Sequence, residues 1–161
     1  MIVKESELQE ARDPIHYGDA SDVTLQRLKD DLTDCAHKMG LPIFLELGQV
    51  KGGSIWKPEM EDCLILYNPE HEKDYYKFCI RLVHIGVSGK VWFYSFGSSK
   101  QMNKLNLFQQ ARDGAVKNGG GEIMANVMAS LFTPGLSKKK LENEGMYYDL
   151  VLKLFENVFL S

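Results

Sequence analysis

Two apolar segments joined by a glycine-containing turn, at residues 75–96, constrain the fold of this chain more than any other feature. In the first segment, large apolar side chains and one histidine alternate with smaller or charged ones: Tyr76, Phe78, Ile80, Leu82 and His84 against Lys77, Cys79, Arg81 and Val83. The second segment, 91–96, is the densest aromatic stretch of the chain. A period of two is typical of a β-strand, and Gly86 and Gly89 supply the turn. We therefore predict an antiparallel hairpin here.

The segments on either side of this hairpin predict the rest of the fold. Apolar residues at three- and four-residue steps indicate a helix over 25–39, which Gly40 and Pro42 end. Apolar runs predict two further strands, at 43–50 and 63–67. Helical spacing returns three times after the hairpin, at 105–116, 123–132 and 147–158. Strands followed by helices predict an α+β two-layer sandwich, with an antiparallel sheet of about four strands and helices packed mainly on one face.

The length of 161 residues is typical of a single domain, and 44% hydrophobic with 25% charged residues is an ordinary globular composition. A chain of this size buries roughly 70% of its unfolded surface, so it needs no staple to hold a core. Residues 1–20 are polar and contain Pro14 and Gly18 as breakers. We predict one domain over 1–161, with an arm at 1–20 that holds at most one short helix around 6–12.

Charge and cysteine usage narrow the classes of partner and compartment. The formal net charge is -3, from 19 basic and 22 acidic side chains, which disfavours general binding of nucleic acid. No run of about 18 uncharged apolar residues predicts a membrane span, and no signal peptide is expected. Cys35, Cys63 and Cys79 are an odd number without the spacing of a disulfide framework. We expect a cytoplasmic protein that binds neither nucleic acid nor membrane.

No motif with a known catalytic or ligand-binding spacing occurs in the chain. The HExxH, CxxC and GxSxG patterns and the phosphate-binding glycine loops are absent from the sequence. We therefore predict neither a metal site nor a cofactor. The sequence leaves open whether the chain is an enzyme.

The aromatic strand offers the first functional hypothesis. Trp92, Tyr94 and Phe96 fall on one face of it, and the other face is apolar as well. If helices cover only one face, the aromatic face is exposed and marks a protein partner or a homo-oligomer interface. The alternative is a central strand whose second face is covered by the N-terminal arm or the terminal helix. The first hypothesis is thus a non-enzymatic interaction or self-associating module.

The second hypothesis is a small-molecule-binding protein or enzyme with a pocket between sheet and helices. His84 shares the apolar face of its strand, where a neutral imidazole needs a hydrogen-bond partner. That partner is either a pocket group or a backbone carbonyl. Glu46, within an apolar strand, and Arg81, beside Cys79, are the other polar groups nominated for such a pocket. The hypothesis requires at least two of the three to converge.

Overall fold

A computed structural model of the chain describes residues 1–70, 76–97, 106 and 138–160. The helices expected at 105–116 and 123–132 lie outside these residues, apart from position 106. Residues 1–97 and 154–161 form one compact unit, and residues 98–153 form another. The sheet belongs to the first unit.

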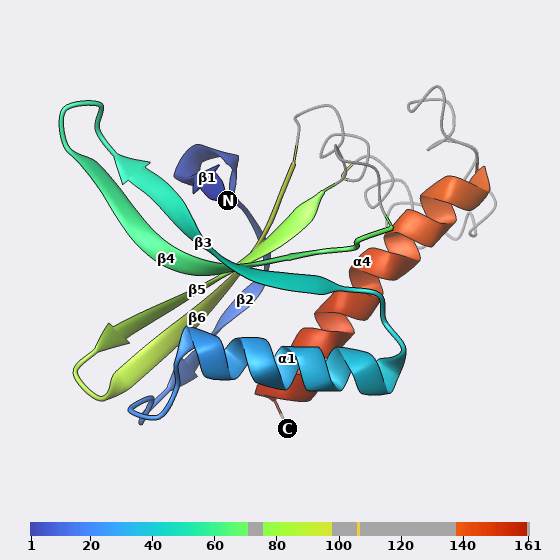
Figure 1. The fold of residues 1–161 in the computed structure, drawn as a ribbon, viewed down its shortest axis with the longest axis horizontal. Coiled ribbons are helices and arrows are strands. Elements are labelled where there is room, and N and C mark those ends of the chain that lie inside the picture. Colours follow the sequence, from blue (N-terminus) through green and yellow to red (C-terminus); the bar gives the residue numbers. More distant parts are fainter. Residues whose placement is uncertain (71–75, 98–105, 107–137, 161) are drawn as a thin grey trace, which may run out of the picture. The chain divides into compact units, whose positions relative to one another are not determined.

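The sheet has six strands, and one pair of them is parallel (Figure 1). In chain order the strands are β1 (Ile2–Lys4), β2 (Gln9–Tyr17), β3 (Phe44–Gly53), β4 (Pro58–Tyr67), β5 (Lys77–Ile85) and β6 (Ser88–Phe96). Their order in the sheet is β1-β3-β4-β5-β6-β2, with β1 parallel to β3 and every other pair antiparallel. The mixed α+β class is confirmed, whereas the prediction of about four antiparallel strands was wrong.

Both additional strands come from the N-terminal segment, for which the sequence predicted one short helix at most. The segment instead forms β1, a 3-10 turn (η1, Glu5–Glu7) and β2. Their sequences gave little signal, because β1 is only three residues long and no residue of β2 is fully buried. Pro14 also interrupts the apolar alternation of β2, and the register with β6 shifts twice between Glu10 and Ile15. Proline and irregular pairing are tolerated on a strand at the edge of a sheet.

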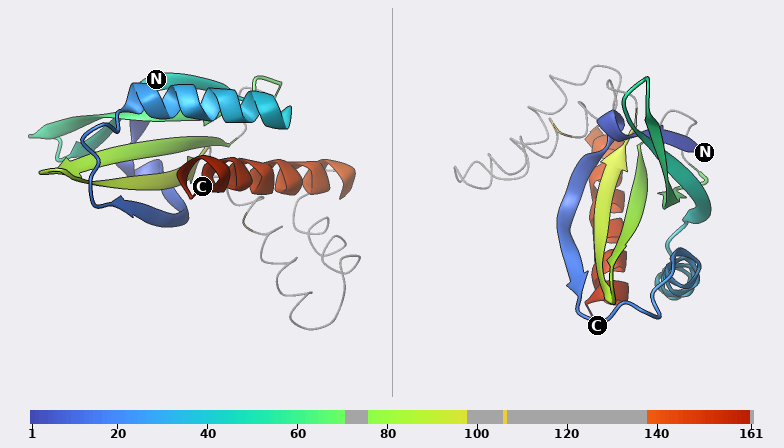
Figure 2. Two further views of the ribbon diagram at one scale, coloured as in Figure 1. Left: turned by 90° about the horizontal axis from the view of Figure 1, so that it is seen from below. Right: turned by 90° about the vertical axis from the view of Figure 1, so that its left-hand side faces the viewer.

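The connection between β1 and β2 requires the sheet to curl. These two strands lie at opposite edges, which a flat six-stranded sheet would hold about 24 Å apart at about 4.8 Å per neighbour. The link from Lys4 to Gln9 reaches at most about 18 Å when fully extended. Figure 2 shows the result, with the N-terminal segment passing from one edge of the curled sheet to the other. We call the side that it crosses the inner face.

Helix α1 (Leu25–Met39) lies against β3 and β4. Its first turn is capped by Thr24, whose side chain accepts a hydrogen bond from the backbone N–H of Arg27, 3.1 Å away. It ends at Gly40, whose φ of 65° is the left-handed conformation that favours glycine. The sequence predicted the end at Gly40, but it offered Ser21 or Asp22 as the N-cap, which the structure places at Thr24. The buried residues of α1 are Leu28, Leu32 and Ala36.

The last turns of helix α4 (Lys138–Phe159) pack on the outer face of the sheet. The Phe155 ring contacts Phe78 and Phe93 at centroid distances of 5.9 and 5.0 Å, and Phe159 also contacts Phe93 at 5.0 Å. Phe93 and Ile80 lie directly opposite each other on β6 and β5, and both are buried. This aromatic packing fixes the base of the β5–β6 hairpin in the core.

A second, smaller core lies on the inner face. Its buried members are Val3, Val50, Cys63, Ile65, Cys79 and Phe96, and its partly buried members are Leu8, Tyr67 and Tyr94. Every one of them belongs to a strand or, for Leu8, to the segment that joins η1 to β2. The N-terminal residues therefore cover part of the inner face. This agrees with the alternative in which the aromatic strand is a central strand whose second face is covered by the N-terminal segment.

Candidate interaction surfaces

The three aromatic residues nominated from the sequence share the inner face but do not form an open patch. Phe96 is only 7% exposed and belongs to the inner core. Trp92 and Tyr94 are half-buried, and their rings stack with centroids 6.3 Å apart and an interplanar angle of 11°. The surface that they present is therefore limited to the outer parts of two rings.

Cations already occupy the faces of these two rings. The Lys90 ammonium lies 3.9 Å from the centroid of the Trp92 ring, and the Arg81 guanidinium lies 5.9 Å from that of Tyr94. Arg81 also donates a hydrogen bond to the Tyr94 hydroxyl over 3.4 Å. A cation above an aromatic face stabilises the pair by about 0.5–2 kcal/mol. Lys90, Trp92, Tyr94 and Arg81 thus form one continuous ladder.

The ladder ends at a carboxylate that the sequence did not indicate. Arg81 donates to Glu61 of β4 through two nitrogens, Nη2 at 2.5 Å and Nε at 2.7 Å from the same oxygen. Burial lowers the pKa of Arg81, but the hydrogen bond and charge of Glu61 outweigh it, so this pKa lies above its ordinary value. The pKa of Tyr94 also lies above its ordinary value, in this case because burial disfavours the charged phenolate. The Arg81 guanidinium is thus paired with Glu61 and Tyr94 of the same chain, so its charge is already balanced within the fold.

The three polar groups nominated for a pocket are divided between the two faces. Glu46 pairs through Ile65 to Cys79, so it shares the inner face with Arg81. His84 is three residues from Arg81 on the same strand and therefore lies on the outer face. Its Nε2 is 3.0 Å from the carbonyl oxygen of Ala20, the backbone partner that the sequence had offered as one alternative. The structure brings Glu46 and Arg81 to one face and leaves His84 on the other.

Two free cysteines, Cys63 and Cys79, are buried together in the inner core. A hydrogen bond between the thiols, together with burial, raises the pKa of Cys79 far above its ordinary value. Such a thiol is a poor nucleophile, since the thiolate is the reactive form. Within the described residues, no cluster of three or more histidine, cysteine or acidic side chains has the geometry to hold a metal ion.

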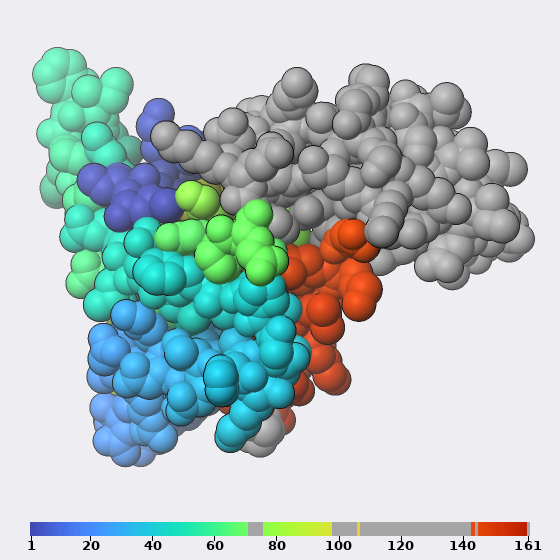
Figure 3. Space-filling model, turned by 45° about the vertical axis from the view of Figure 1, so that its right-hand side comes forward, coloured from blue at the N-terminus to red at the C-terminus, as the bar shows by residue number. Residues whose placement is uncertain are grey.

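Of the residues that the structure describes, the most exposed large apolar ones lie elsewhere, at the tip of the β3–β4 hairpin. Ile55 is 96% exposed and Trp56 is 95% exposed, so almost the whole surface of both side chains is in water. The loop is closed by the backbone N–H of Lys57, which donates to the carbonyl oxygen of Ser54 at 3.2 Å and to its hydroxyl at 3.0 Å. The hairpin projects beyond the rest of the sheet (Figures 1 and 3). Its tip therefore presents an isoleucine and a tryptophan on an ordered turn.

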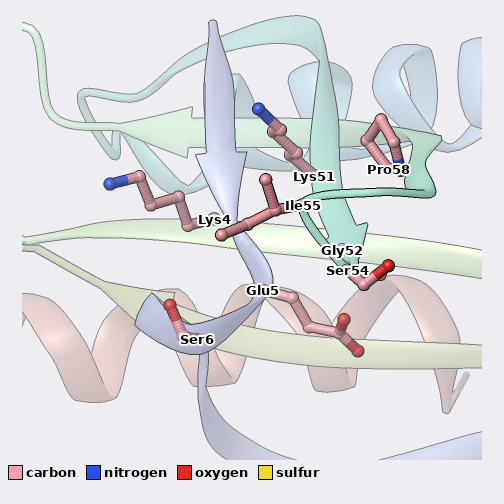
Figure 4. Close-up of a pocket in the computed structure, with 9 residues that line it drawn as sticks. Lys4, Glu5, Ser6, Lys51, Gly52, Ser54, Ile55 and Pro58 are labelled. Atoms are coloured by element: carbon pink, nitrogen blue, oxygen red, sulfur yellow. The ribbon is translucent and has the colours of Figure 1, made fainter.

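A cleft of about 560 Å³ adjoins this tip. It is lined by the N-terminal segment on one side and the hairpin on the other, through Lys4, Glu5, Ser6, Lys51, Gly52, Gly53, Ser54, Ile55 and Pro58. Figure 4 shows Ile55 between the side chains of Lys4 and Lys51, with Glu5 and Ser54 gathered at the other end. The cleft combines an apolar wall, two cations and one carboxylate.

Other exposed apolar side chains lie along the same edge of the sheet, on the strands next to this hairpin. In the described part of the chain, most of the large exposed ones lie on or beside β1, β3 and β4: Met1, Ile2, Phe44, Leu47, Ile55, Trp56 and Met60. This surface was not predicted from the sequence, because residues 55–62 have no decisive period. The signal that it contained was an Ile-Trp pair set between Gly52-Gly53-Ser54 and Pro58, where a turn is normally polar.

Comparisons of the chain with protein-family models, with characterised proteins and with solved structures gave no significant match. Among the described residues, no helix combines the length and the apolar character needed to span a membrane. A function is therefore proposed from the exposure, charge and shape of the surface of the described residues.

Proposed function

We propose that this chain is a non-enzymatic interaction module that binds a protein, another or its own kind, through the tip of the β3–β4 hairpin. The observation that carries the proposal is the nearly complete exposure of Ile55 and Trp56. Burying one large apolar side chain stabilises a complex by about 1.5–3 kcal/mol, and tryptophan is enriched among residues that dominate binding energy. Ile2, Leu47 and Met60 are also exposed and share one face of β1, β3 and β4, so they extend the apolar surface along the hairpin. We call these five residues the hairpin surface.

The order of the turn also supports a binding role. Its two hydrogen bonds hold Ser54 and Lys57 together, and Gly53 adopts a φ of 76° that a residue with a side chain rarely takes. A loop that is already fixed loses less conformational entropy when a partner binds it. The hairpin surface therefore offers apolar contact area at a small entropic cost.

The other two surfaces support a function less well. On the inner face, Trp92 and Tyr94 are half-buried and already paired with cations, so they offer less surface to a partner. The alternative of a pocket that uses His84, Glu46 and Arg81 has less support, since these residues are divided between two faces.

The free thiols and the net charge of -3 support a cytoplasmic protein whose partner is a protein and not a nucleic acid.

Photo-cross-linking in cells tests this proposal. A benzophenone amino acid replaces Ile55 in one variant and Ile85 in a matched control, since Ile85 is also exposed but lies at the tip of the β5–β6 hairpin. We expect a discrete protein adduct from position 55 and none above background from position 85. Equal or absent adducts at the two positions would contradict the proposal.

A further inference from the structure

Resting on the proposed function, we infer that one partner of the hairpin is a second copy of this chain. In the pair, the Trp56 ring of each copy enters the cleft beside the hairpin of the other. Two identical contacts are thereby made around a twofold axis.

The size of the cleft fits this occupant. Its volume of about 560 Å³ falls within the range of roughly 300–1,000 Å³ that accommodates drug-sized ligands. An indole ring is smaller than such a ligand. The cleft of one copy can therefore hold the whole Trp56 ring of the other copy, together with part of the backbone that carries this ring. The wall that Ile55 contributes gives the ring an apolar contact.

The charges in the cleft favour an aromatic ring as well. Lys4 and Lys51 lie directly opposite each other in the parallel pairing of β1 and β3, and like charges in this position repel. No ion pair joins either lysine to another of the described residues. A tryptophan face attracts a cation more strongly than any other aromatic ring does. The same chain uses this contact within the fold, where the Lys90 ammonium lies 3.9 Å from the Trp92 ring.

The positions of the ring and the cleft satisfy the requirement of a twofold pair. Such an interface needs both halves of the contact on the same surface of one chain. Ile55 lines the cleft and Trp56 is the next residue, so the ring and its site are adjacent. Ile2, Leu47 and Met60 add exposed apolar surface along the same face of β1, β3 and β4, and a specific interface buries roughly 800 Å² per partner. A ring and a cleft on opposite surfaces would instead generate an open chain of molecules.

Multi-angle light scattering and sedimentation velocity of the purified full chain over a hundredfold concentration range test the inference. We expect the mass to rise from that of one chain, 18.3 kDa, toward twice this value as concentration increases. Trp56→Ser removes the ring, and Ser6→Trp fills the cleft from the exposed turn η1. Each substitution should weaken the dimer at least about tenfold, the scale of a dominant interface residue. Ile85→Ser, at the other hairpin tip, should leave the dimer unchanged.

A mixture of the two defective variants provides the sharpest test. Trp56→Ser retains an open cleft and Ser6→Trp retains its Trp56 ring, so one of the two contacts can form between them. We expect the mixture to form heterodimers at concentrations at which either variant alone is mostly monomeric. Circular dichroism and thermal unfolding verify that both variants are folded.

Three outcomes would overturn the inference: a monomeric wild type at every concentration, a dimer insensitive to Trp56→Ser, or a mixture without heterodimers. The cross-linking experiment separates this failure from failure of the proposed function. If the chain is monomeric but still cross-links at position 55 to a protein of a different mass, the proposed interaction function stands. Only the second copy of the chain is then excluded as the partner. A monomeric chain without any such adduct contradicts both.

Discussion

The two long hairpins of the sheet both have exposed apolar tips, but among the described residues only the β5–β6 tip is hydrogen-bonded to a loop outside its own hairpin. At the β5–β6 tip, Ala20 donates its backbone N–H to the carbonyl oxygen of Val87 over 2.6 Å. The Ser88 hydroxyl donates to the carbonyl oxygen of Gly18 over 3.2 Å, and His84 is paired with the carbonyl oxygen of Ala20. The loop at 18–20 thus anchors this hairpin.

At the β3–β4 tip, by contrast, the hydrogen bonds of the loop at 54–57 are internal to it in the described part of the chain. Its apolar side chains are also more exposed, since Ile85 at the anchored tip is 80% exposed against 95% for Trp56. Among the described residues, the β3–β4 tip thus combines the larger exposure with hydrogen bonds that stay within its own turn. An exposed residue on an anchored turn can belong to a contact that stabilises the fold, whereas the hydrogen bonds described for the 54–57 turn stabilise only the turn itself.

The largest loss of stability is expected from a substitution in the buried part of the anchored β5–β6 hairpin. Ile80→Ala removes a fully buried side chain that lies opposite Phe93 of β6 and Leu64 of β4. We expect it to lower the free energy of unfolding by about 2–5 kcal/mol, because the cavity left in the core cannot collapse completely. Urea unfolding followed by circular dichroism measures the change.

The matched control lies on the free hairpin. Met60→Ala removes an apolar side chain of similar size that is 45% exposed, and its effect should be clearly smaller than that of Ile80→Ala. Equal losses in the two variants would show that the free hairpin is as deeply integrated in the core as the anchored one.

A smaller effect tests the anchor directly. A Cβ atom added at Gly89 would lie 2.5 Å from the Cβ atom of Ala20, so Gly89→Ala must displace the 18–20 loop. We expect a loss of about 1–3 kcal/mol in the free energy of unfolding, typical of overpacking, and faster hydrogen exchange at the Ala20 amide. Gly18→Ala is the control, since nothing lies within 4 Å of its added Cβ. Unchanged exchange at Ala20 in Gly89→Ala would mean that this loop does not hold the hairpin.

The anchored hairpin was also the part of the fold that the sequence predicted best. Its alternation of apolar and polar residues reports directly on two faces, and the structure pairs Lys77 to Ile85 with Ser88 to Phe96 without a shift. The cap of α1 at Gly40 was predictable for a similar reason, because one residue determines the local conformation. Local signals of this kind require no knowledge of the partner strand.

The features that the sequence did not predict depend on pairing between distant segments. Glu61 and Arg81 are 20 residues apart, and their ion pair follows from the register of β4 with β5. The parallel pairing of β1 with β3 joins residues nearly 50 positions apart, and β1 is too short to show a period. The cleft between Ser6 and Ser54 exists only because these pairings bring its two walls together.

The smallest effect on stability is expected at the residue with the largest proposed effect on binding. Trp56→Ser should change the free energy of unfolding by no more than about 0.5 kcal/mol, because the side chain is almost completely in water and contributes little to the core. The measurement requires a dilute sample, since self-association would itself add apparent stability to the wild type. Thermal unfolding at two concentrations separates these contributions. At low concentration the two proteins should unfold together, and at high concentration only the wild type should gain stability. A clear loss in the dilute sample would assign Trp56 to the fold and remove the contrast between the two hairpin tips.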